Sequence, residues 1–148
     1  LTISVPLGLG LENPGEIRVK GDGNQSSDTR FGSPFQDNGT KVLEVKPGKT
    51  IALIGGNIIL EGGSLKSESG RIELGSVGSG NVDFSFSPQN IEFSYDRANS
   101  FKDIKLLKES SLQSSSLSAI SSIKNHGYIQ VRGKNIDIKD GSIILNSN

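Results

Sequence analysis

The sequence predicts an all-β protein: a right-handed parallel β-helix with a β-hairpin inserted around residues 81–96. Three observations lead to this fold class, namely short apolar tracts that recur every seven residues, glycines between the tracts, and an internal repeat. The recurring tracts are centred on Ile51, Ile58, Leu65 and Ile72. Each tract suits a strand of three or four residues, which is too short to be stable alone in a flat sheet.

A coiled coil also places apolar residues at intervals of seven, but here glycine interrupts nearly every heptad. Glycine in a helix interior costs about 1 kcal/mol relative to alanine, and the β-branched residues of the tracts favour strands. Three tracts instead make one coil of about 21 residues, and stacked coils pair equivalent strands at about 4.8 Å. Parallel crossovers are nearly always right-handed, which sets the predicted hand.

An internal repeat supports the stacking. Residues 57–65 and 135–143 align at a constant offset of 78 and share the pattern N-I-x-[LI]-x-x-G-S-[LI]. In this alignment Leu65 corresponds to Ile143. Repeats of this kind bury their apolar faces only against one another, so we expect columns of inward aliphatic side chains. Asn57 and Asn135 open equivalent strands after glycine-containing turns, where asparagine suits a turn role.

The remaining segments are assigned around these coils. We expect one β-helical segment of a longer chain, with opening strands at 1–20, a polar loop at 21–41, coils at 42–80, the hairpin at 81–96 and further coils at 97–148. In the hairpin, apolar and aromatic residues alternate with polar ones on both sides of a turn at 87–90. Residues 112–123 lie in a serine-rich stretch and are predicted to form irregular turns rather than a helix.

Composition excludes several classes of protein. The chain has 16 basic and 16 acidic residues, and this balance argues against a nucleic-acid binder and against polybasic membrane attachment. It has no cysteine, so disulfides, thiolate metal sites and thiol nucleophiles are excluded. No apolar run approaches the length of a transmembrane helix. The hydrophobic content of 32% is low, and we therefore expect a core of small, repeated aliphatic clusters.

Few side chains suggest a chemical site. The aromatic residues of the hairpin either pack on the coils or form a surface that binds a carbohydrate or another partner; they are Phe84, Phe86, Phe93 and Tyr95. Arg71 and Glu73 alternate with inward aliphatic residues, so we expect them to face outward. Asp22 and its neighbours begin like a calcium loop, but serines replace the required glycine and glutamate. The single histidine, His126, lies in a turn. We expect no metal, no cofactor and no catalytic residue.

The central block of the chain carries a family resemblance. Residues 45–65, V-K-P-G-K-T-I-A-L-I-G-G-N-I-I-L-E-G-G-S-L, are followed by G-R-I-E-L-G-S-V at 70–77. This block resembles cyanobacterial exoproteins of the filamentous haemagglutinin type, in the β-helical region that follows the two-partner secretion domain. Weaker similarities at 5–17, 101–104 and 127–142 extend the resemblance over nearly the whole chain.

The resemblance implies a β-helix that is secreted or held at the outer cell surface, after export through the outer-membrane barrel transporter of the two-partner system. The family's secretion signals are expected before this segment, and Asn13-Pro14-Gly15 shares only an Asn-Pro pair with such a signal. We therefore predict a structural or adhesive segment without enzymatic activity. The alternative is a β-helix that binds or processes carbohydrate, and cell-surface or extracellular polysaccharide is a candidate partner in both cases.

Overall fold

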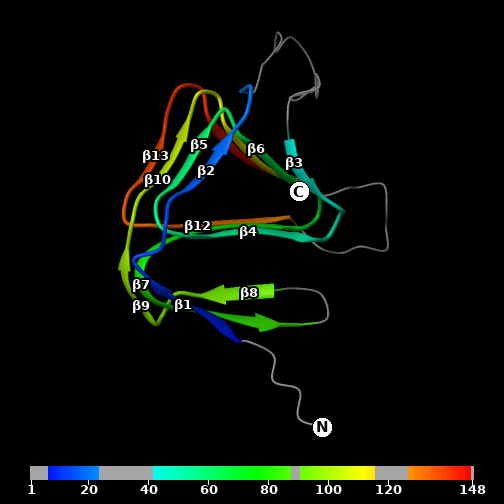
Figure 1. Cartoon of the computed structure of the whole chain (residues 1–148). Helices are drawn as coiled ribbons and strands as arrows, with labels where there is room; N and C mark the ends of the chain where they lie inside the picture. The colour runs from blue at the N-terminus through cyan, green and yellow to red at the C-terminus, as the bar shows by residue number, and fades with distance from the viewer. Residues whose placement is uncertain (1–6, 24–41, 88–90, 116–126, 148) are drawn as a thin grey trace, which may run out of the picture.

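The computed structural model describes residues 7–23, 42–87, 91–115 and 127–147. Its strands wind into a parallel β-helix, in which three sheets form the sides of a stack of coils (Figure 1). Most of the predicted polar loop, the hairpin turn at 88–90, residues 116–126 with His126, and the first six residues lie outside the described part of the chain.

The chain returns to the same side of the stack once per coil, and the strands on each side form one sheet. The first sheet contains, in spatial order, β2 (Ile17–Lys20), β5 (Ile58–Glu61), β10 (Ile104–Leu107) and β13 (Ile136–Ile138). The second contains β3 (Val42–Val45), β6 (Ser64–Ser67), β11 (Ser111–Ser115) and β14 (Ile143–Ser147). The third contains β4 (Thr50–Gly55), the first part of β7 (Arg71–Phe86) and β12 (Tyr128–Arg132), paired in parallel. We call β2–β4 coil 1, β5–β7 coil 2, β10–β12 coil 3 and β13–β14 coil 4.

Aliphatic side chains stack in columns through the interior of the helix. In the third sheet Ile51 pairs with Ile72, which lies 21 positions later, as the sequence spacing predicts. In the first sheet Leu60 pairs with Val19 below and Leu106 above. The buried core consists of Ile51, Ile58, Leu60, Leu65, Ile72, Leu74, Ile104, Leu106 and Leu112. Each such side chain stabilises the fold by about 1.5–3 kcal/mol when it is fully buried. The stacked parallel sheets and their aliphatic columns confirm the predicted parallel β-helix.

One detail of the predicted repeat is wrong. Leu65 pairs with Leu112, and Leu112 pairs with Ile144 rather than with Ile143. Leu65 lies five positions after Leu60 in coil 2, whereas the equivalent Ile144 lies six positions after Ile138 in coil 4. The longer connection of coil 4 includes Asp140 and Gly141, both with positive φ. The extra residue shifts the register of β14 by one position, so the offset of 78 holds in the first sheet but not in the second.

The predicted hairpin is present and belongs to a larger antiparallel extension. Strand β7 has 16 residues, and its second part leaves the third sheet to pair with three antiparallel strands. These are β1 (Gly8–Glu12), β8 (Ile91–Ser94) and β9 (Ala98–Phe101). β7 pairs irregularly with β9 around Ser79 and Gly80, where the strand bends. We refer to the second part of β7 with β1, β8 and β9 as the antiparallel extension.

The serine-rich stretch is more regular than predicted, because Ser111–Ser115 forms strand β11 in the middle of the second sheet. Its buried hydroxyl groups take part in the stacking. Ser111 donates a hydrogen bond to Ser64 of coil 2 at 3.0 Å, and Ser114 donates to the backbone carbonyl of Ser67 at 3.0 Å. Serine can therefore replace an aliphatic residue in a column when its hydroxyl finds a partner in the neighbouring coil.

Candidate functional site

The antiparallel extension folds back against the outer face of the third sheet, and the contact between them is polar as well as aromatic. In Figure 1, β8 lies beside the layer formed by β4 and β12. Tyr95, which follows β8, reaches Glu73 on β7 with an O–O distance of 2.6 Å. The sequence expectation that Glu73 faces away from the aliphatic core is correct, but the extension covers it completely, and it is 0% exposed.

Glu73 is the centre of a set of interacting side chains that we call the Arg71 cluster: Arg71, Glu73, Phe93, Tyr95, Tyr128 and Gln130. The guanidinium of Arg71 donates to one carboxylate oxygen of Glu73 at 3.0 and 3.1 Å, and Tyr95 donates to the other. Arg71 also donates to the amide oxygen of Gln130 at 2.9 Å. Its charged carbon lies 4.5 Å from the ring centre of Tyr128 and 5.5 Å from that of Phe93. Every buried side-chain nitrogen and oxygen atom of this cluster has a hydrogen-bond partner.

Burial and hydrogen bonding act in opposite directions on Glu73. Removal from water raises the pKa of its carboxyl group, whereas the hydrogen bonds from Tyr95 and Arg71 favour the charged form; burial is the larger effect. The pKa of the Tyr95 hydroxyl is raised well above its ordinary value, first by burial and then by its bond to Glu73. Perturbed groups of this kind occur both at functional sites and in structural ion-pair networks.

The neighbouring glycine makes this arrangement possible. A Cβ atom on Gly75 would lie 2.4 Å from the Tyr95 hydroxyl oxygen and 2.7 Å from the ring. The backbone of β7 therefore admits the tyrosine only because residue 75 has no side chain. A second cation–aromatic contact lies on the same side of the stack, where the guanidinium of Arg132 is 5.0 Å from the ring centre of Phe101.

The four aromatic residues selected from the sequence do not share one environment. Tyr95 is buried in the Arg71 cluster, and Phe93 is half-buried with Arg71 against its ring. Phe84 is half-buried and packs against Phe93, with ring centres 6.1 Å apart. Phe86 is exposed at the end of β7 and meets the ring of Phe84 edge-on at 5.6 Å. Only part of the predicted surface is therefore open to solvent.

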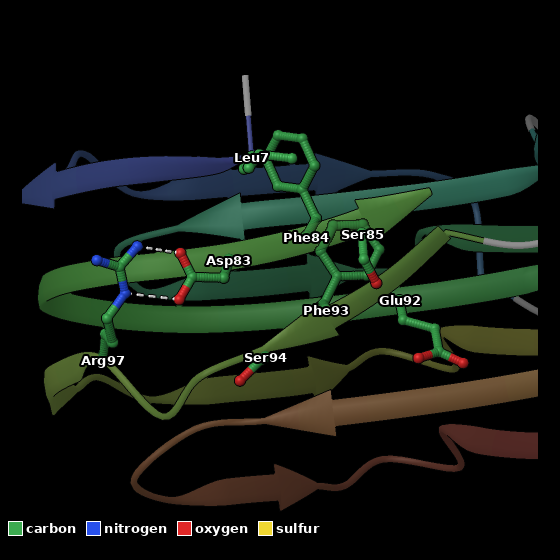
Figure 2. A pocket seen from close by; sticks show the side chains of 8 residues that line it. All are labelled: Leu7, Asp83, Phe84, Ser85, Glu92, Phe93, Ser94 and Arg97. Atoms are coloured by element: carbon green, nitrogen blue, oxygen red, sulfur yellow. Dashed lines mark hydrogen bonds and ion pairs between the residues drawn. The ribbon is translucent and has the colours of Figure 1, made fainter. Parts of the chain in front are cut away.

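A groove of about 430 Å³ lies where β7 and β8 meet the start of β1. Figure 2 shows its lining residues, which are Leu7, Asp83, Phe84, Ser85, Glu92, Phe93, Ser94 and Arg97. At one end Arg97 forms a two-point ion pair with Asp83, one bond of which measures 2.7 Å. Sequence reasoning selected the two phenylalanines but missed the charged residues, because their meeting depends on the pairing of β7 with β8 and on the turn that follows β8.

A comparison with protein families identifies the chain. The family model of the TPS secretion domain, the two-partner secretion domain, matches residues 1–131. This chain belongs to that family. The expected position after the secretion domain is wrong, because the match places these residues within the domain itself. Comparisons with curated proteins and with solved structures found no match.

Membership in the TPS secretion domain family establishes how the protein reaches its place of action. Proteins with this domain are exported by two-partner secretion and reach the cell surface or the extracellular medium, which agrees with the localisation expected from the sequence. A TPS domain implies recognition by the outer-membrane transporter of the two-partner system.

Two further searches concern the described residues only. They include no helix that is long and apolar enough to cross a membrane. They contain no group of three or more metal-ligating side chains. Asp22 is exposed, and the calcium-like stretch from residue 24 onward lies outside the described residues.

Proposed function

We propose that this TPS secretion domain is the β-helical stem of a haemagglutinin-like exoprotein of cyanobacterial type, and that it contributes to adhesion at the cell surface. One observation carries the stem role. The aliphatic columns continue to the last described coil, where Ile136, Ile138 and Ile144 remain 46%, 44% and 38% exposed. These residues continue the columns that bury Ile58, Leu60 and Leu65 completely.

An exposed coil of this kind is a template for another coil. In stacked repeat proteins each repeat contacts its neighbours, and stability is the sum of repeat and interface contributions. Strands β13 and β14 offer unpaired backbone groups on one edge and aliphatic side chains in register with the columns. A further coil would bury these isoleucines and gain about 1.5–3 kcal/mol for each. The proposed role requires no catalytic group.

Charge substitutions at equivalent inward and outward positions test the stem role. In the isolated domain, Ile138→Asp should change the free energy of unfolding by about 1 kcal/mol or less, because the side chain is partly in water already. In the full exoprotein the same carboxylate would be buried without a partner, at a cost of several kcal/mol, and should reduce the amount of folded protein at the cell surface.

The matched control is Ile59→Asp, which places the same charge on the outward side of coil 2. It should have a similar small effect in the isolated domain and in the full exoprotein. Unfolding of the isolated domain is followed by circular dichroism in denaturant, and surface display by antibody labelling. If Ile138→Asp is as mild in the full exoprotein as in the isolated domain, no coil stacks on β13 and the stem role is wrong.

A further inference from the structure

A second groove lies on the outward face of the antiparallel extension, where β1, β7 and β9 meet. It has a volume of about 500 Å³, within the range of about 300–1,000 Å³ that is usual for ligand sites. We call it the Gly10 groove. Two glycines take part in its lining, Gly10 and Gly80, and its polar side chains are those of Glu12, Ser79, Asn81 and Asn99.

The polar side chains of the Gly10 groove share one face of the sheet. Gly10 is directly opposite Asn81 in the β1–β7 ladder, and Glu12, two residues after Gly10, is directly opposite Ser79. Directly opposite residues, and residues two positions apart in one strand, point to the same side of a sheet. Asn99 comes directly after an inward residue of β9 and is exposed. The alternate residues pack in or against the buried aromatic cluster on the inward side; they are Leu11, Val82 and Ala98.

Gly10 keeps this groove open, and its place in the fold does not require a glycine. Its backbone lies outside the left-handed region, and a Cβ atom there would come near only the side-chain oxygen of Asn81, at 3.3 Å, among the described residues. Gly8 and Gly80 differ, because a Cβ atom would lie 2.8 and 2.5 Å from backbone oxygens. Glycine weakens a strand, and in a strand it often marks a place where a ligand approaches the backbone closely.

The hydrogen-bonding groups around Gly10 are available to a ligand. The carboxylate of Glu12 has no hydrogen-bond or ion-pair partner among the described residues, and the same holds for the side-chain amides of Asn81 and Asn99. Two amide groups and one carboxylate therefore converge on a groove whose centre carries no side chain.

The charge of the groove is negative. Glu12 is the only charged residue of its lining. Arg97 and Lys102, the cations that precede and follow β9, are held by Asp83 and by the side-chain oxygen of Asn13. A negatively charged ligand would therefore meet an unpaired carboxylate without a compensating cation.

We propose that the Gly10 groove binds a neutral saccharide unit of a surface or extracellular glycan, a site that rests on the adhesive role proposed above. Each sugar hydroxyl group both donates and accepts hydrogen bonds. The lining matches this chemistry, because the asparagine amides offer donors and acceptors and Glu12 offers an acceptor. A cationic ligand would use the carboxylate alone and leave the amide donors unmatched, and an exposed ion pair adds little affinity. The missing side chain at residue 10 leaves room for the sugar ring above the backbone of β1.

The direct test is a titration of the isotope-labelled domain with the neutral oligosaccharides cellohexaose and maltohexaose at millimolar concentrations, followed by NMR. We expect shifts at the backbone amides of Gly10 and Gly80 and at the side-chain amide groups of Asn81 and Asn99. Oligomers of alginate, which is acidic, and of chitosan, which is cationic, serve as comparisons and should leave these signals in place.

Two variants connect binding to particular positions. Gly10→Val fills the groove with a residue that suits a strand, so it should keep or raise Tm while weakening saccharide binding more than about ten-fold. Its matched control is Gly15→Val, at an exposed glycine where a Cβ atom meets nothing within 4 Å. Glu12→Gln should weaken binding about three- to ten-fold, since hydrogen bonds to charged groups are stronger than neutral ones. Its matched control is Glu109→Gln, at an exposed glutamate outside the groove. Both controls should bind like the native domain.

The proposal is overturned if neither neutral oligosaccharide shifts the groove signals, if alginate or chitosan binds there instead, or if Gly10→Val binds as tightly as Gly15→Val. It is also overturned if Gly10→Val fails to fold, because the glycine would then serve the fold rather than a ligand.

Adhesion of the full exoprotein to a glycan-coated surface separates this result from the broader proposal. Adhesion that persists unchanged in Gly10→Val contradicts the Gly10 groove as the contact site while leaving the adhesive role intact. Loss of adhesion in Gly10→Val but not in Gly15→Val supports both.

Discussion

The hydroxyl group of Tyr95 gives the sharpest prediction about the antiparallel extension. Replacing Tyr95 with phenylalanine keeps the ring beside Gly75 and removes only the donor to Glu73, which lies at 2.6 Å. The carboxylate is 0% exposed, so water cannot replace the lost bond without an opening of the packing. A hydrogen bond to a charged group contributes about 1.5–3 kcal/mol, and we expect Tyr95→Phe to lower the free energy of unfolding by this amount.

Thermal and denaturant unfolding measure this loss. For a domain of this size, 1 kcal/mol corresponds to about 2–4 °C, so Tm should fall by about 3–12 °C. The control is Tyr128→Phe, which removes a hydroxyl group from the same side of the stack. That hydroxyl is exposed and makes only a 3.4 Å contact with Gln130, so its loss should cost about 0.5 kcal/mol or less.

The same control variant allows a spectroscopic check. The chain has two tyrosines and no tryptophan, so Tyr95 is the sole tyrosine in Tyr128→Phe. Because burial and the bond to Glu73 raise its pKa, no tyrosinate absorbance should develop on alkaline titration until the domain unfolds. Equal stability losses in the two variants, or tyrosinate formation in the folded Tyr128→Phe domain, would refute the assignment of Tyr95 to a closed contact with Glu73.

Three more predictions address other contacts. Burial raises the pKa of Glu73, so the folded state holds this proton more tightly, and stability falls as pH rises from the ordinary glutamate pKa through the raised one. In denaturant unfolding, the difference in stability between the native domain and Glu73→Gln should therefore shrink over that pH interval. A difference that stays constant would count against the raised pKa of Glu73. Leu60→Ala should cost about 2–5 kcal/mol, whereas Ile138→Ala, at a side chain 44% exposed, should cost much less in the isolated domain, and similar losses by calorimetry would contradict the columns. Gly75→Ala would place a Cβ atom 2.4 Å from the buried tyrosine hydroxyl and should speed amide exchange in β8, while Gly15→Ala, with nothing within 4 Å, should not; equal exchange would mean that the extension does not need the glycine.

The coils could be predicted from sequence because their information is local. Apolar residues at intervals of seven fix which side chains point inward, and the pairing of Ile51 with Ile72 follows from that spacing alone. The one-residue shift at Ile144 could not be predicted in the same way. The final strand can be aligned in two ways, with either Ile143 or Ile144 in the column of Leu65 and Leu112. Both alignments place an isoleucine there, and only the length of the preceding turn distinguishes them.

The antiparallel extension was only half predictable for a different reason. The alternation of aromatic and polar residues indicates a hairpin, but no local pattern specifies that β1 joins it or that it folds back on the third sheet. The pair formed by Asp83 and Arg97 depends on that geometry, and so does the burial of Glu73. Alternation with Ile72 and Leu74 correctly places Glu73 outside the aliphatic core, yet outside the core is not the same as exposed when a second layer covers the strand.

The Arg71 cluster also makes the extension depend on the coils in a way that simple stacking does not. In a solenoid each coil contacts its neighbours, and local damage can remain local. Arg71 lies on coil 2, but its guanidinium is held by Gln130 and Tyr128 of coil 3 as well as by Phe93 of the extension. The charge of Arg71 is thus enclosed by coil 2, coil 3 and the extension. Removing one of its partner side chains leaves a guanidinium or carboxylate buried with fewer partners, and this costs more free energy than the lost contact itself. We therefore expect that a change in coil 3 which removes Gln130 or Tyr128 also weakens the contact between Arg71 and Phe93, so that damage to coil 3 reaches the extension through coil 2.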